Sequence, residues 1–236
     1  MNSKYSKLLT IILVVAIIIV VILFIFFGIQ IYKQYYVEKQ QSDMSEIFDS
    51  QVSATNVTTP QPPTNTNTTT SNEVVAPVIT DNENTVGQGG SGPGGSGGSS
   101  GGIKYKGYTM VGKIEIPKIK VNYPILAKTS TKAIEIAVSV LYGPGPNKVG
   151  NTVIVGHNYK NGTMFSNNKK LEAGDEIYIT DTDGNRIKYI IYDKQLLAPE
   201  DFEYASRDTK GAREISLSTC TDDVNSRLVI FAKEAN

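Results

Sequence analysis

Apolar positions are distributed unevenly along the chain, and the densest run lies near the N-terminus. From residue 8 to residue 31 the sequence consists of Ile, Val, Leu and Phe, interrupted only by Thr10, Ala16, Gly28 and Gln30. About 20 apolar residues are enough for a helix to cross a bilayer. The apolar core of a cleaved signal peptide has only about 7–15 residues, followed by small residues, whereas this run ends in Gln30-Ile31-Tyr32-Lys33. We therefore predict an uncleaved transmembrane signal-anchor helix at 8–31, behind a short cytoplasmic segment at 1–7.

In the next segment, 32–102, the part from residue 52 to residue 85 has too few apolar residues to build a core. The stretch from Val52 to Thr85 is rich in Thr, Asn, Pro and Ser, and Gly87 to Gly102 is almost entirely Gly and Ser. Both compositions are typical of flexible linkers. We predict a juxtamembrane segment and, from about residue 40, a disordered tether with a root-mean-square reach on the order of 40 Å.

In the remainder of the chain, 103–236, short runs of β-branched and other apolar residues alternate with turn signals. Seven runs are predicted strands: Val111–Ile116, Val121–Leu126, Asn151–His157, Glu176–Thr180, Arg186–Leu197, Glu214–Thr219 and Arg227–Lys233. Residues 181–185 are a predicted hairpin turn, since Asp183-Gly184 supplies the positive φ angles. Helical patterns are limited to 131–138 and a second short piece at 164–171. An all-β domain follows, either a closed barrel or a sandwich.

Composition narrows the classes of function. Lys plus Arg and Asp plus Glu are equal at 23 each, so the chain has no general attraction to nucleic acid. No zinc finger, phosphate-binding loop or Rossmann glycine pattern is present. A single cysteine excludes an intrachain disulfide and a Cys-rich zinc site, and it leaves a free thiol.

The single cysteine and the single histidine both lie at the ends of predicted strands. His157 ends one strand, Cys220 directly follows another, and Arg227 opens the last. A nucleophilic thiol needs a base or a cation beside it, because the thiolate is the attacking form. Each residue also has an ordinary alternative: an inert buried thiol, a hydrogen-bonded imidazole or a solvated charge at a sheet edge. The shared position at strand ends favours a cysteine acyl-transferase or peptidase.

The motifs around these residues resemble those of the sortases, the cysteine transpeptidases of Gram-positive bacterial surfaces. Ser216-Leu217-Ser218-Thr219-Cys220, with Arg227 seven positions later, resembles the family signature, and Val155-Gly156-His157-Asn158 resembles its histidine motif. The family's usual continuation and opening strand are matched by Gly162-Thr163-Met164-Phe165, Leu171, Gly174-Asp175 and Gly112-Lys113-Ile114-Glu115-Ile116-Pro117. The resemblance covers residues 108–234.

The resemblance implies a closed eight-stranded β-barrel with one or two short helices, in a single-pass protein of the cell membrane whose catalytic domain is extracellular. Cys220 would attack a threonine-like carbonyl in the C-terminal sorting signal of a secreted protein. An amine, from a peptidoglycan precursor or a pilin lysine, would resolve the thioester. His157 suits proton transfer to and from these amines, and Arg227 suits stabilisation of developing negative charge. Thr219 would shape the substrate groove, or be merely structural.

The subclass is left open by the sequence. The stretches around His157 and Cys220 resemble class B sortases, but the loop at 198–212 is shorter than the helical insertion usual in that class. Classes A and D have shorter loops and are the alternatives. No Asp-Pro-aromatic lid motif precedes the domain, which favours an anchoring enzyme over a pilus polymerase.

The sequence leaves three other functions and one possible ligand open. A pilin-polymerising sortase, a cysteine peptidase that only hydrolyses, and a tethered binding module with an incidental Cys and His are the alternatives. Acidic loop residues could supply oxygen ligands to Ca²⁺, and the candidates are Glu172, Asp175, Glu200, Asp201 and Glu203. Solvated loops are the commoner explanation of such residues, so we predict no metal and no cofactor.

Overall fold

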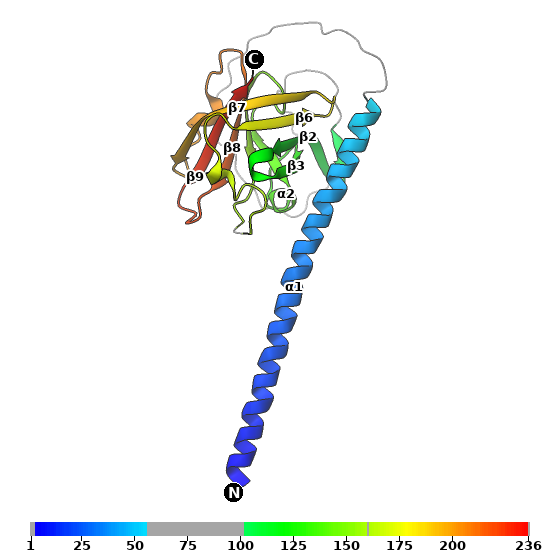
Figure 1. Cartoon of the computed structure of the whole chain (residues 1–236), viewed down its shortest axis with the longest axis vertical. Coiled ribbons are helices and arrows are strands. Elements are labelled where there is room, and N and C mark those ends of the chain that lie inside the picture. The colour runs from blue at the N-terminus through cyan, green and yellow to red at the C-terminus, as the bar shows by residue number, and fades with distance from the viewer. Residues whose placement is uncertain (1–2, 56–101, 160, 236) are drawn as a thin grey trace, which may run out of the picture. The chain divides into compact units, whose positions relative to one another are not determined.

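The computed structural model describes residues 3–55, 102–159 and 161–235 (Figure 1). The chain divides into two compact units, one up to Gln40 and one from Gln41 to the C-terminus. Helix α1, Ser3–Thr55, contributes to both units. Most of the predicted linker, including its Gly/Ser-rich part, lies outside the described residues.

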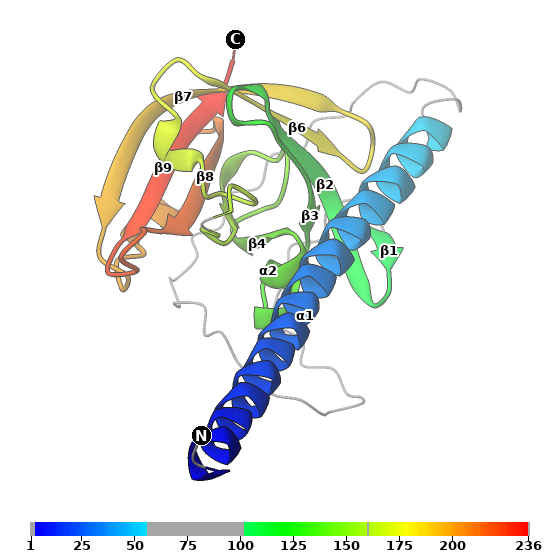
Figure 2. The ribbon, with the colours of Figure 1, turned by 60° about the horizontal axis from the view of Figure 1, so that its bottom comes forward.

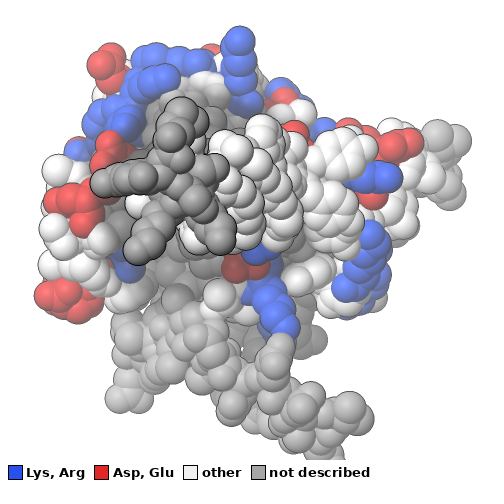
Figure 3. Space-filling model, turned by 90° about the horizontal axis from the view of Figure 1, so that it is seen from below, with Lys and Arg blue, Asp and Glu red and all other residues white. Residues whose placement is uncertain are grey.

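The first unit is the apolar part of helix α1. Its large apolar side chains from Leu8 to Ile31 are all exposed, and Phe24 reaches 74%. The uncharged surface of this stretch is white in Figure 3. A helix that is hydrophobic on every side, and that is long enough to cross a bilayer, is compatible with a membrane anchor.

The last turns of helix α1 belong to the second unit and pack on it. Met44, Phe48 and Val52 are buried, at 0%, 0% and 9% exposure. Their spacing of four residues places them on one face of the helix. The prediction of a tether from about residue 40 therefore does not hold for residues 41–55, because this apolar stripe keeps them helical and packed.

Nine strands form one continuous sheet within the described residues. They are β1 Ile103–Tyr105, β2 Tyr108–Ile116, β3 Val121–Leu126, β4 Val138–Tyr142, β5 Gly150–Val155, β6 Glu176–Asp181, β7 Arg186–Leu197, β8 Arg213–Cys220 and β9 Arg227–Glu234. The order is β1-β2-β3-β4-β5-β8-β9-β7-β6, and pairing of β2 with β6 closes eight of them into a barrel. The predicted closed eight-stranded barrel is confirmed, with β1 as an additional edge strand on β2.

Short helices fill the connections between strands. They are α2 Thr131–Ile136 and the 3₁₀ turns η1 Pro117–Ile119, η2 Asn168–Lys170 and η3 Glu203–Ser206. The side chain of Ser130 caps α2 by accepting a hydrogen bond from the Ala133 N–H at 3.2 Å. The helix ends two residues earlier than the predicted 131–138, because Val138 already pairs in parallel with Ile125 of β3.

The strand order brings three strand ends together at one end of the barrel. Two of these strands, β8 and β9, are seen side by side in Figure 2. β5 pairs with β8 in parallel, so their C-terminal ends are neighbours. β9 pairs with β8 in antiparallel fashion, so its first residue lies beside the last residue of β8. The core beneath is apolar and includes Ile154, Leu217 and Ile230, each at 0% exposure. A rigid scaffold of this kind holds the groups at its rim in fixed positions.

Candidate active site

The three residues singled out in the sequence meet at this end of the barrel. Cys220, the last residue of β8, is in register with Arg227, the first residue of β9. His157 follows β5 by two residues, and the backbone N–H of Gly156 donates to the Ser218 carbonyl at 3.3 Å, which continues the β5–β8 pairing. His157, Cys220 and Arg227 line one cavity of about 140 Å³.

The guanidinium of Arg227 contacts the sulfur directly. Its Nη1 lies 2.7 Å from Cys220 Sγ, and the thiol is half-buried. A permanent cation in contact with a sulfur stabilises negative charge there, or on an oxygen that develops charge beside it. Side-chain alternation places Arg227 and Cys220 on the same face of the sheet.

His157 is partly buried, and its ring packs against the ring of Tyr159 with centroids 4.8 Å apart. Burial lowers the pKa of His157, because loss of solvent disfavours the imidazolium. The negative charge of Glu135 on helix α2 acts in the opposite direction and raises it. Burial prevails, so the neutral imidazole is favoured at neutral pH.

Gly156 has no room for a side chain. A Cβ at this position would lie 2.9 Å from both Phe165 Cδ2 and Val138 Cγ1. The glycine before His157 therefore lets the backbone of the histidine segment pack closely on the core.

Thr219 and Asn158 tie the histidine segment to the cysteine strand. The Thr219 hydroxyl donates to the Gly156 carbonyl at 2.7 Å, and the threonine is only 5% exposed. Asn158 Nδ2 donates to the Cys220 carbonyl and to Asp222 Oδ1, both at 2.9 Å. The hydroxyl of Thr219 is thus engaged in structure, although the residue also lines the cavity. No role was predicted for Asn158, whose position directly after His157 was the available signal.

Part of the cavity wall comes from residues to which the sequence analysis gave no role. Phe202 and Tyr204, in the loop between β7 and β8, line the cavity beside Cys220, and Ile134 of helix α2 lines it as well. The rings of Phe202 and Tyr204 stack with centroids 6.2 Å apart. Two aromatic residues in the loop before the cysteine strand were the only sequence signal for this wall.

A second cavity, of about 460 Å³, also reaches Cys220. Its lining includes Asn158, Thr219, Leu228 and the charged residues Lys169 and Lys194, together with Asp222. Lys169 Nζ and Asp222 Oδ2 form an ion pair of 2.8 Å at its edge. Cys220 therefore lines both cavities.

Two of the acidic residues considered for Ca²⁺ lie close together, and both face a lysine. Asp175 is paired with Lys118 at 2.8 Å, and Glu172 lies 4.0 Å from the same ammonium group. In the part of the chain that the structure describes, no group of three or more His, Cys, Asp and Glu side chains is placed to hold a metal ion.

Comparison with known proteins gives one consistent family. The sequence model of the sortase domain matches residues 114–235. Sortase A of Bacillus anthracis is 28% identical over 124 residues, 51% of this chain and 58% of that protein. Sortase A from Corynebacterium diphtheriae superimposes with a TM-score of 0.50 at 30% identity, covering 55% of this chain and 62% of that one. A pilus-related sortase C of Group B Streptococcus gives 0.50 at 28% identity, covering 54% and 68%.

The match to the family model covers more than half of the chain, and the chain belongs to the sortase family. The resemblance seen in the motifs is thereby confirmed. The matched region spans little more than half the length of the curated relatives, 58% and 53%. The similar proteins carry the names sortase A, sortase C and sortase D, so the class-B-like reading of the motifs stays a prediction.

Proposed function

We propose that this protein is a membrane-anchored cysteine transpeptidase that cleaves the C-terminal sorting signal of secreted proteins and transfers the acyl part to an amine. The observation that carries the proposal is the 2.7 Å contact between Arg227 and the sulfur of Cys220, inside a cavity that His157 also lines. A nucleophile, a cation and a proton-transfer group at one site are what acyl transfer through a thioester requires.

In the first half-reaction the Cys220 thiol gives its proton to the neutral His157 imidazole, and the resulting thiolate adds to the scissile carbonyl carbon. Arg227 stabilises the negative charge that develops on the carbonyl oxygen, since its guanidinium lies beside the attacking sulfur. When the tetrahedral intermediate collapses, the C–N bond breaks and the departing nitrogen takes a proton from the His157 imidazolium. The products are a Cys220 thioester, a neutral imidazole and a free amine.

In the second half-reaction an acceptor amine attacks the thioester carbonyl. The neutral His157 accepts the proton that the amine loses, and the Cys220 thiolate leaves as the C–S bond breaks. Burial of His157 favours the neutral form needed here. Two cavities that Cys220 lines suit a reaction with two substrates. Water as the acceptor would give hydrolysis.

The apolar helix and the family together support a position in the cell membrane, with a single span and an extracellular catalytic domain. The acceptor is an amine such as that of a peptidoglycan precursor, which would attach the secreted protein to the cell wall. Similarity to a pilus-related sortase C supports, as a second candidate, transfer to a pilin lysine. The site residues described need no cofactor for either transfer.

Transfer and hydrolysis are separated by one experiment. The protein is incubated with a library of peptides that each carry one threonyl amide bond, with and without added glycyl or lysyl amines. We expect an amide between the acyl fragment and the added amine, identified by mass spectrometry. Release of free acid alone, at every amine concentration, would show a peptidase and overturn the transpeptidase proposal.

A further inference from the structure

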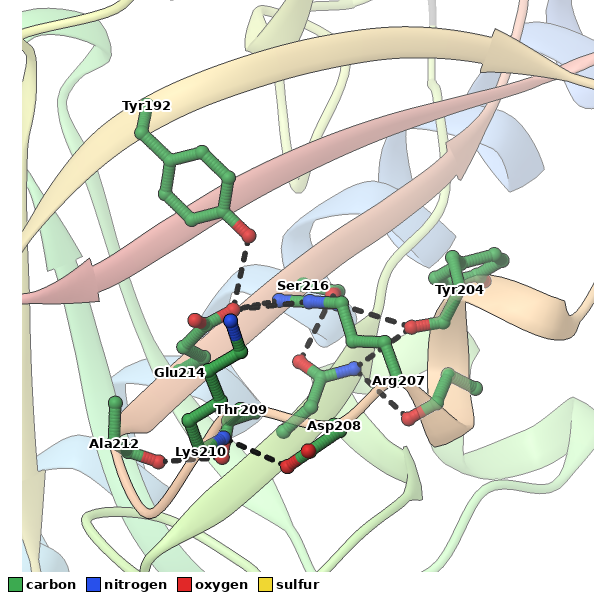
Figure 4. Close-up of polar contacts among 11 residues, drawn as sticks. Tyr192, Tyr204, Arg207, Asp208, Thr209, Lys210, Ala212, Glu214 and Ser216 are labelled. Carbon is green, nitrogen blue, oxygen red and sulfur yellow. Dashed lines mark hydrogen bonds and ion pairs between the residues drawn. The ribbon is translucent and has the colours of Figure 1, made fainter.

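The face of strand β8 that presents the thiol is unusually polar. Side chains alternate across a strand, so Glu214, Ser216, Ser218 and Cys220 share one face. The opposite face contributes Ile215 and Leu217 to the barrel core, at 1% and 0% exposure. Ser216 and Ser218 are nevertheless buried, at 0% and 4% exposure. The loop at 198–212 contacts this polar face, and one arginine organises the contact (Figure 4).

Arg207 holds the loop by four hydrogen bonds and a ring contact. Its Nε and Nη2 donate to Glu214 Oε2 at 3.0 and 2.6 Å. Its Nη1 donates to Ser216 Oγ at 2.8 Å and to the Tyr204 carbonyl at 3.0 Å. The guanidinium also lies 4.8 Å from the ring centroid of Phe231 on β9. The pair with Glu214 is largely sheltered from solvent, with side-chain exposures of 22% and 14%.

Asn151 of strand β5 fixes the same part of the loop from the other side. Its Nδ2 donates to the carbonyls of Tyr204 and Ala205 at 3.2 and 3.0 Å, and its Oδ1 accepts from Ser216 Oγ at 3.0 Å. The Tyr204 carbonyl thus accepts from Arg207 (Figure 4). It also accepts from Asn151. A charge-assisted network whose members are all satisfied holds backbone in place far better than scattered surface contacts.

The backbone held in this way carries the aromatic wall of the cavity. Tyr204 and Phe202 line the cavity together with His157 and Cys220. The Tyr204 ring also packs edge-on against Phe231, with centroids 6.1 Å apart. Displacement of the Tyr204 backbone would move both rings away from the sulfur.

We propose that Arg207 is a positioning residue that keeps the Phe202–Tyr204 wall in place to receive the acyl part of the substrate. This proposal rests on the proposed function for the identity of the substrate. Arg207 lines neither cavity that reaches Cys220, so its effect is transmitted through Tyr204. If only a fraction of the molecules has the loop in the conformation that binds substrate, the apparent dissociation constant of the peptide rises by the inverse of that fraction.

The test compares Arg207→Met and Arg207→Lys with a matched control, Arg213→Met. Arg213 is the first residue of β8, directly after the loop, and it pairs with a carboxylate, that of Glu234, at 2.9 Å. Like Arg207, it lines neither cavity at Cys220. The probe is the best wild-type substrate found in the library of threonyl peptides. Its dissociation constant is measured in the Cys220→Ala background. The acylation rate is measured in proteins that retain Cys220, in single turnover at saturating peptide.

For Arg207→Met we expect roughly tenfold weaker peptide binding, with saturated acylation within about twofold of wild type. Arg207→Lys lies between, because an ammonium cannot reproduce the fork that contacts three groups. Arg213→Met binds peptide within about twofold of wild type. Unchanged binding in both Arg207 variants, or an equal loss in the Arg213 control, would overturn the proposal.

A readout that does not depend on a substrate keeps this test separate from the proposed function. Hydrogen exchange at residues 203–206 is expected to become faster in Arg207→Lys than in Arg213→Met, while strand β8 stays protected. Equal rates of hydrogen exchange at residues 203–206 in the two variants would refute the positioning role of Arg207, even if no peptide substrate is found. Absence of any acyl-enzyme in the wild type, with faster loop exchange in Arg207→Lys, would instead refute the proposed function alone.

Discussion

At the scale of single residues, substitutions of Arg227 distinguish the contribution of its positive charge from that of its planar set of N–H donors. Its Nη1 contacts Cys220 Sγ at 2.7 Å, and a guanidinium presents several N–H donors in a fixed plane. Lysine keeps the charge but loses the paired donors. Because loss of one oxyanion donor typically costs 10²–10³ in rate, we expect Arg227→Lys to acylate more slowly by about that factor.

Single-turnover acylation of the two variants checks this prediction. Arg227→Ala is expected to be slower still, with peptide affinity in the Cys220→Ala background changed less than the chemical step. Near-normal acylation by Arg227→Ala would remove Arg227 from the catalytic site and leave a solvated charge at a strand end.

His157 is the only histidine in the chain, so its titration can be followed by NMR without assignment. Burial lowers its pKa, and the charge of Glu135 raises it. We expect the folded protein to titrate at lower pH than the urea-unfolded chain, and Glu135→Gln to move the midpoint lower still. His157 then binds its proton more tightly in the unfolded chain than in the folded protein. The free energy of unfolding therefore decreases as the pH falls through the pKa that His157 has in the unfolded chain. A midpoint that rises in Glu135→Gln would contradict this account of the electrostatics.

The sequence predicts some site residues well and others not at all. Cys220 and Arg227 lie at the ends of strands, and His157 lies two residues beyond one. The apolar runs of these strands are clear in the sequence, so the meeting of the three residues follows from strand pairing. Tyr204 and Arg207 lie in an irregular loop. Their positions depend on side-chain bonds to residues on two distant strands, which leave no periodic signal.

At the scale of elements, the end of helix α1 is part of the folded catalytic unit. Phe48 is fully buried in a cluster with Met110 and Leu126, and Lys113 Nζ pairs with Asp49 at 2.7 Å. Removing a buried phenylalanine typically costs about 3–5 kcal/mol. We expect Phe48→Ala to lower the thermal midpoint of the full-length protein in detergent by several degrees.

The control for this prediction is Glu46→Ala, an exposed position on the same turn of helix. Its midpoint should stay close to that of the wild type, since exposed substitutions rarely change stability by more than about 0.5 kcal/mol. Equal midpoints for both variants would mean that the helix does not pack on the domain in solution.

The success of the element predictions depended on how local the determining pattern was. The seven predicted strands all exist, since each carries its own run of apolar residues. Strand β4 was missed: its sequence follows helix α2 without a break, and its parallel pairing with β3 involves only two residue pairs. Residues 41–55 were assigned to a tether because an apolar stripe of three side chains is faint beside a span of 24 apolar positions.

At the scale of the whole molecule, an apolar helix precedes a closed barrel with a thiol, a cation and an imidazole at one rim. Family membership accounts for the barrel, and the proposed function accounts for the arrangement at its rim. We propose that the helix anchors the protein in the membrane, that the residues at the strand ends carry out the reaction, and that the loop at 198–212 shapes the site for the acyl part of the substrate.

The most direct measurement is the intact mass of the protein after reaction with its best peptide and rapid acid quenching. Cys220 is the only cysteine, so a thioester can form at one place. The account predicts a mass increase equal to the acyl fragment, sensitive to hydroxylamine, located on the peptide that contains Cys220 and absent from Cys220→Ala. Transfer or cleavage that persists undiminished in Cys220→Ala, with no adduct in the wild type, would contradict it.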